Sequence, residues 1–211
     1  ECIARYGMTP TMLMDYMGMF MYGGGGFHCV WLNDEDIEIF KKHDMSIVTN
    51  PGSNTKLASG IAPLTRFLDN GINLAIGTDG PASNNCLDMF REMFLATGLQ
   101  KLRNNDAAAM NAMDVLRMAT VGGAKAMGLK NCDILAEGKA ADLIMIDLHQ
   151  PNMQPLNVIE KNIVYSGSKQ NVKMTMVNGK ILYENGEFFI GEDPERIYAD
   201  VNDLIARCKE A

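Results

Sequence analysis

The sequence predicts an α/β protein: the last part of a TIM-like (β/α)8 barrel, followed by a small β-rich module and a C-terminal helix. Short apolar runs alternate with amphipathic segments up to Asp79, the pattern of βαβ units in a parallel sheet. Asn178-Gly179 and Asn185-Gly186 are two-residue hairpin signals, which indicate antiparallel strands later in the chain. With 211 residues, 47% of them hydrophobic, the chain can bury a sizeable core.

The first elements follow a run of glycines at 23–26, which predicts a break in regular structure. We expect a short buried strand over 27–32 and then an amphipathic helix over 34–43, capped by Asn33 or Asp34. A second strand is predicted over 45–49, and 50–60 reads as a loop.

The third βα unit leads to the most informative segment. A helix over 62–70 ends at Gly71 in the usual C-terminal glycine position, and the apolar run 72–76 predicts a buried strand. Further helices are predicted at the following residues: 87–102, 112–120 and 122–127.

From residue 134 onward the pattern changes to strands. They are predicted over 141–147, 172–177, 181–183 and 188–190, and the last helix covers 194–209, with Pro194 in its first turn. A complete (β/α)8 barrel needs ~250 residues. Since only about 130 residues with three clear βα units precede the β module, we divide the chain into a barrel portion, 1–130, and a second portion, 131–211.

Composition excludes several classes of protein. The formal charge of −7 and the lack of a basic patch argue against nucleic acid or an anionic membrane as a partner. No apolar stretch reaches the ~18 residues that span a bilayer. The five cysteines are scattered without paired spacing, which predicts reduced thiols and a cytoplasmic protein.

Gly77-Thr78-Asp79-Gly80 places a carboxylate at the carboxyl end of a predicted strand, where an α/β barrel keeps its catalytic and metal-binding groups. The alternative is that Asp79 only organises the turn into Gly80-Pro81. Among the histidines, His28 reads as a core residue on its apolar neighbours, His43 as a helix-terminal cation and His149 as a solvated loop residue. No zinc-site spacing is present, so this chain alone cannot supply the three or four ligands of a catalytic zinc.

Several motifs together resemble the amidohydrolase superfamily, most closely its 5′-methylthioadenosine/S-adenosylhomocysteine deaminase group. They are Phe27-His28-Cys29-Val30-Trp31-Leu32, Asn50-Pro51-Gly52-Ser53-Asn54-Thr55-Lys56, Gly77-Thr78-Asp79-Gly80-Pro81-Ala82-Ser83-Asn84-Asn85, Met118-Ala119-Thr120, Glu137-Gly138-Lys139-Ala140-Ala141-Asp142-Leu143 and Val177-Asn178-Gly179-Lys180.

The resemblance implies roles for individual residues. Asp79 matches the aspartate that ligates the metal and shuttles a proton, and His28 matches the histidine that orients the hydroxide on the metal. Ser53, Asn54 and the run Ser83-Asn84-Asn85 resemble loop residues that shape the site, with turn formation as the alternative. The remaining ligands would lie before Glu1.

The implied protein is a metal-dependent hydrolytic deaminase of an adenosine derivative, with a small nucleoside-like substrate and one divalent metal. The resemblance favours zinc and a homo-oligomer, and it implies that 131–211 contains part of a small β-sandwich. The same machinery would also suit a guanine deaminase, a triazine chlorohydrolase or a cyclic amidase. A third hypothesis is a catalytically dead fragment that acts as a folding or interaction module.

Overall fold

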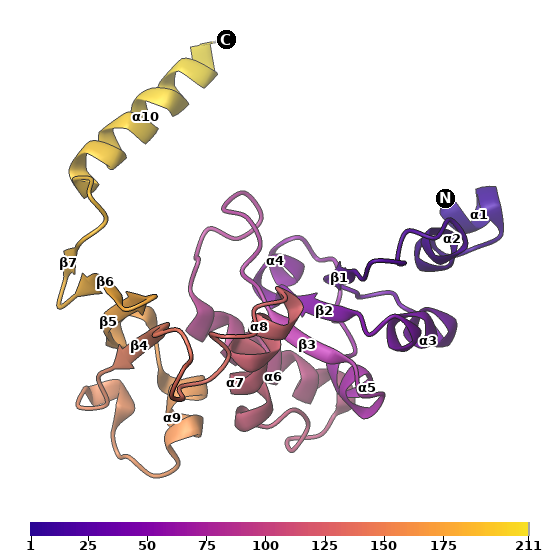
Figure 1. Ribbon diagram of the computed structural model, residues 1–211, viewed down its shortest axis with the longest axis horizontal. Coiled ribbons are helices and arrows are strands. Elements are labelled where there is room, and N and C mark those ends of the chain that lie inside the picture. Colours follow the sequence, from indigo (N-terminus) through magenta and orange to yellow (C-terminus); the bar gives the residue numbers. More distant parts are fainter. Residues whose placement is uncertain (211) are drawn as a thin grey trace.

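A computed structural model describes residues 1–210, in which the strands form two separate sheets (Figure 1). The first sheet is entirely parallel, in the order β1-β2-β3, so the carboxyl ends of its strands share one edge. Its strands are β1 (Gly25–Phe27), β2 (Ser46–Thr49) and β3 (Asn73–Ile76). The predicted α/β class with βαβ units is therefore confirmed.

Helices connect these strands, as a parallel sheet requires. The connection from β1 to β2 is α3 (Asp34–Lys42), which begins with a complete capping box between Asn33 and Asp36. Two short helices, α4 (Pro51–Lys56) and α5 (Leu64–Asp69), connect β2 to β3. The chain leaves α5 through Gly71, whose φ of 73° suits a glycine.

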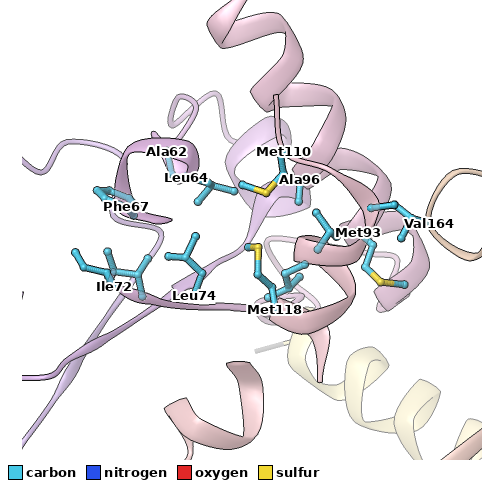
Figure 2. Close-up of a cluster of buried hydrophobic side chains, with 14 of the residues drawn as sticks. Ala62, Leu64, Phe67, Ile72, Leu74, Met93, Ala96, Met110, Met118 and Val164 are labelled. Carbon is cyan, nitrogen blue, oxygen red and sulfur yellow. The ribbon is translucent and has the colours of Figure 1, made fainter. Parts of the chain in front are cut away.

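The main core lies where β3 and α5 pack against the helices that follow (Figure 2). Phe67, Leu74 and Val115 are almost completely buried. Val164, from a helix much later in the chain, joins the same cluster. The helices that follow β3 are α6 (Met89–Asn104), α7 (Ala112–Ala119) and α8 (Val121–Ala126).

The second sheet is antiparallel, in the order β4-β5-β6-β7. Asn178 and Gly179 both have positive φ, 48° and 77°, and join β5 to β6 as the hairpin signal predicts. The strands are β4 (Leu143–Ile146), β5 (Val172–Val177), β6 (Lys180–Glu184) and β7 (Glu187–Phe188). Between β4 and β5 lie η1 (Pro151–Met153), α9 (Ile159–Ser166) and η2 (Lys169–Asn171).

The two ends of the chain carry helices at opposite ends of the molecule (Figure 1). At the amino end are α1 (Cys2–Tyr6) and α2 (Pro10–Tyr16), and Asp15 of α2 pairs with Lys42 and His43 at the end of α3. At the carboxyl end α10 (Pro194–Glu210) projects away from the rest of the fold. None of the helices in the described part of the chain is both long and apolar enough to cross a membrane.

Two local predictions were wrong. The strand expected over 27–32 lies earlier, and the chain leaves it at His28 and Cys29, which both adopt positive φ. Phe27, the last residue of β1, and Trp31, which lies beyond the strand, are both exposed, at 70% and 85%. The segment 50–60, predicted as a loop, contains α4, whose Pro51 occupies the first turn.

Candidate active site

His28 and Asp79 lie at the carboxyl edge of the parallel sheet. His28 directly follows β1, and Asp79 comes three residues after the end of β3. Their side chains approach each other, with 3.8 Å between His28 Nε2 and Asp79 Oδ2, and each is about one-third exposed. The His28 side chain is thus a candidate site residue at this edge, and it is not the core histidine that its apolar sequence neighbours indicated.

Two consecutive residues of α4 hold this pair. Ser53 Oγ donates to Asp79 Oδ2 over 2.7 Å, and Asn54 Oδ1 lies 2.8 Å from His28 Nδ1. Both side chains are buried. Because an amide oxygen only accepts, His28 Nδ1 donates in this contact, which leaves Nε2 as the ring nitrogen that faces Asp79.

The environment of Asp79 favours its ionised form. The hydroxyls of Ser83 and Ser53 and the N–H of Gly80 lower the pKa of Asp79 to about 2. The Gly80 N–H lies 2.7 Å from Asp79 Oδ1. A hydroxyl has a single proton, so Ser83 serves either Asp79 or the Gly80 carbonyl, which is 3.1 Å from Ser83 Oγ.

An open cavity of about 390 Å³ adjoins these groups. His28, Ser53 and Asp79 form its polar side, while Trp31 and Leu57 provide apolar surface. The cavity therefore combines a few convergent polar groups with apolar walls, as binding sites for small molecules do.

The other predicted loop residues brace the site from outside. Asn84 is buried, and its Nδ2 donates to the carbonyl of Thr78 over 2.9 Å. Asn85 is exposed and accepts a hydrogen bond from Lys56 Nζ over 2.6 Å. The structure therefore brings His28, Asp79, Ser53 and Asn54 together, with Ser83 beside Asp79, whereas Asn84 and Asn85 act on the loop backbone or its neighbours.

Sequence reasoning missed Glu92, a completely buried carboxylate in α6. Its Oε2 accepts from the N–H of Gly52, and its Oε1 accepts from Asn84 Nδ2, both over 2.7 Å. Burial raises the pKa of Glu92, and these two hydrogen bonds oppose that rise. A glutamate within a helical pattern gives no sequence signal of such a role, since most helical glutamates are solvated.

The donor set of His28 and Asp79 fits part of a zinc site. Imidazole nitrogen and carboxylate oxygen are both atoms that zinc accepts as ligands, and the Asn54 contact at Nδ1 leaves Nε2 on the side of Asp79. Zinc takes at least three protein ligands, and residues 1–210 contain no group of three or more His, Cys, Asp or Glu side chains that could hold a metal. The chain thus offers two of the groups that such a centre needs.

The chain is similar to several known deaminases and hydrolases. A 5-methylthioadenosine/S-adenosylhomocysteine deaminase of Thermococcus onnurineus is 45% identical over 185 residues, which are 88% of this chain and 43% of the relative. The structure of a zinc-bound adenosine deaminase from Xanthomonas campestris superposes with a TM-score of 0.94 at 34% identity, over 100% of this chain and 48% of that one. A zinc complex of atrazine chlorohydrolase from Arthrobacter aurescens superposes with a TM-score of 0.89 at 28% identity, over 97% and 45%.

The chain therefore spans just under half the length of the proteins it matches. The family model described as "Amidohydrolase family" matches residues 1–182, which cover both β1 to β3 and most of the antiparallel sheet. A match of that extent identifies the family, and this chain belongs to the amidohydrolases.

Proposed function

We propose that the protein is a metal-dependent hydrolytic deaminase of an adenosine derivative, of the methylthioadenosine and S-adenosylhomocysteine type. The observation that carries this proposal is the convergence of His28 and Asp79 at the carboxyl edge of one parallel sheet, each held by a buried partner. The deaminase names of relatives support the reaction, and the zinc-bound neighbours support the metal.

Each of the two residues then has a distinct role. Asp79 would ligate the metal, and its carboxylate, ionised at neutral pH, would accept a proton from the attacking water and pass it to the departing ammonia. His28, with Nε2 directed to the same point, would hold that water in line by a hydrogen bond. Zinc, when bound, would lower the pKa of water toward neutrality.

The apolar surface of Trp31 and Leu57 beside the polar groups suits a flat, partly apolar substrate such as a purine nucleoside. We also propose that β1 to β3 belong to a TIM barrel, and that the division from a β-sandwich portion falls near residue 130. These statements extend the observed sheet order, in which all three strands are parallel.

A panel of substrates tests the proposal on the intact gene product loaded with zinc. Ammonia release is measured with 5′-methylthioadenosine, S-adenosylhomocysteine, adenosine and guanine. With a chlorotriazine the release of chloride is measured, and with a cyclic amide the formation of the ring-opened acid. We expect turnover of the adenosine derivatives and a loss of at least 10³-fold in kcat for Asp79→Asn, because a group that both ligates and transfers protons is removed.

Asp44→Asn is the matched control, since the Asp44 carboxylate is exposed and forms an ion pair with Lys125 on the surface. Its activity should equal that of the wild-type protein. Preference for guanine, the triazine or the cyclic amide would replace the substrate assignment. Absence of both zinc and activity would leave the non-catalytic hypothesis. An active Asp79→Asn variant would contradict the assigned role.

A further inference from the structure

Glu92 lies outside the candidate site, yet both of its carboxylate oxygens bind segments that carry site residues. We propose that Glu92 is a positioning residue, whose carboxylate ties the segment after β2 to the loop after β3 and thereby sets the separation of His28 and Asp79. This inference rests on the proposed function, because it assigns a purpose to that separation.

The first arm of the tie runs through α4. Glu92 Oε2 accepts from the N–H of Gly52 over 2.7 Å, and the next two residues are Ser53 and Asn54. Ser53 binds Asp79 directly and Asn54 binds His28 directly. A shift of Gly52 would therefore move both partners of the pair at once.

The second arm runs through Asn84. Glu92 Oε1 accepts from Asn84 Nδ2 over 2.7 Å, and the same amide group donates to the carbonyl of Thr78 over 2.9 Å. Thr78 immediately precedes Asp79. The carboxylate thus reaches the Asp79 backbone through one intermediate side chain.

Little free space surrounds the Glu92 carboxylate and its two hydrogen-bond partners. A Cβ added at Gly52 would collide with the Glu92 carboxylate and lie 2.8 Å from Asn84 Nδ2. Glu92, Asn84 and Gly52 are all buried, so no water competes for these hydrogen bonds at the surface. A fixed, solvent-shielded support of this kind is what a preorganised site needs.

The chemistry of the two arms requires a carboxylate. Both partners donate, and the two oxygens of a carboxylate offer an acceptor to each, whereas a carboxamide has one oxygen. In Glu92→Gln one arm keeps its acceptor while the other faces an amide NH2, so a buried donor loses its partner.

Gln100 provides a matched control on the same helix. It is 1% exposed, donates to the carbonyl of Ala62 over 2.8 Å and accepts from the N–H of Leu64 over 3.0 Å. Its Oε1 also accepts a longer hydrogen bond, 3.5 Å, from the N–H of Thr65. Like Glu92, Gln100 is a buried polar side chain with hydrogen bonds to another segment, but that segment is the start of α5 and contains none of the candidate site residues. Gln100→Glu replaces a carboxamide by a carboxylate, and Glu92→Gln makes the reverse replacement.

The experiment compares both variants of the intact gene product by their zinc affinity, measured by chelator competition, and by kcat and KM. The melting temperature of each variant is also measured, so that the two can be compared at a similar loss of stability. We expect Glu92→Gln to weaken zinc binding 10- to 100-fold and to lower kcat in the same range, with KM changed less than threefold. Gln100→Glu should change zinc affinity and kcat less than twofold at a similar loss of melting temperature. Equal effects of the two variants would overturn the inference.

Asn84→Ser is a second variant, which removes the hydrogen bonds from Asn84 to Glu92 and Thr78 and leaves the bond between Gly52 and Glu92 intact. It also alters the bond that Asn84 Oδ1 accepts from the N–H of Cys86. It should weaken zinc binding several-fold, and it decides the matter if Glu92→Gln does not fold; unchanged zinc affinity would then overturn the inference. If the wild-type protein binds zinc but deaminates no adenosine derivative, the proposed function fails while the zinc comparison still tests the role of Glu92.

Discussion

Gly122 marks the closest approach of α8 to the parallel sheet, and it offers a sharp test of how that sheet is held. A Cβ built at Gly122 would collide with the carbonyl oxygen of Leu74 in β3 and lie 3.2 Å from the Arg117 carbonyl oxygen. Both obstacles are backbone atoms, which cannot turn away as a side chain can. Gly122→Ala must therefore push α8 off the strand whose end leads to Asp79.

The neighbouring glycine has the opposite surroundings. A Cβ at Gly123 would meet only the Met118 carbonyl oxygen, at 3.8 Å, which is ordinary van der Waals contact. Overpacking a core costs about 1–3 kcal/mol, and the upper end applies to Gly122 because its neighbours are backbone. Replacing a helical glycine by alanine returns roughly 0.5–1 kcal/mol in both variants.

The net expectation is a loss of about 2 kcal/mol for Gly122→Ala and a gain of about 0.5–1 kcal/mol for Gly123→Ala. For a protein of this size a gap of about 3 kcal/mol corresponds to roughly 6–12 °C between the two melting temperatures. Calorimetry of the two variants and the wild-type protein measures it. Melting temperatures within 1 °C of each other, or a gain for Gly122→Ala, would refute the close packing of α8 on β3.

Two further predictions concern the site and the amino-terminal helices. Ser53→Ala removes a buried hydroxyl that donates to the Asp79 carboxylate, a hydrogen bond worth about 1.5–3 kcal/mol. We therefore expect kcat/KM to fall roughly 10- to 100-fold, with little change in secondary structure by circular dichroism. An unchanged kcat/KM would contradict the contact. Hydrogen bonds from Lys42 and His43 lower the pKa of Asp15 below 3.8 in the folded protein. These contacts therefore stabilise the fold above pH 3.8, and the stabilisation is lost as the pH falls through the lower pKa of the folded state. The difference in melting temperature between wild type and Asp15→Asn should accordingly shrink as the pH falls below 3.8, and an unchanged difference in that range would refute the prediction.

The sequence predicted the elements whose signals are local. The runs that became β2 and β3 are apolar and bounded by turn formers, and Asn178-Gly179 specifies its hairpin by the positive φ that both residues adopt. The placement of Asp79 beyond β3 followed from the same local pattern. The family resemblance, and not the pattern around it, identified His28 as a site residue.

The remaining features depend on contacts that no local pattern encodes. The apolar letters of 27–32 indicated a buried strand, but Phe27 and Trp31 remain exposed in the described residues, so apolar character alone misplaced β1. Glu92 binds partners 8 and 40 residues away, and a spacing of 40 has no meaning without the fold. The helix α9 also went unpredicted, although Val164 is almost fully buried against α6 and α7.

The segment that forms α4 has a low helix propensity, and its tertiary contacts explain why it is nevertheless helical. Pro51, Gly52, Ser53 and Asn54 are poor helix formers, and the segment was accordingly read as a loop. Three of these residues have a specific partner that a better helix former would lose: the bare Gly52 backbone meets Glu92, Ser53 binds Asp79 and Asn54 binds His28. Local propensity is weak because each position is chosen for a tertiary contact, and such local exceptions occur where a site is built. The conflict between propensity and structure at α4 is therefore the pattern expected if the edge of the sheet around His28 and Asp79 is the active site.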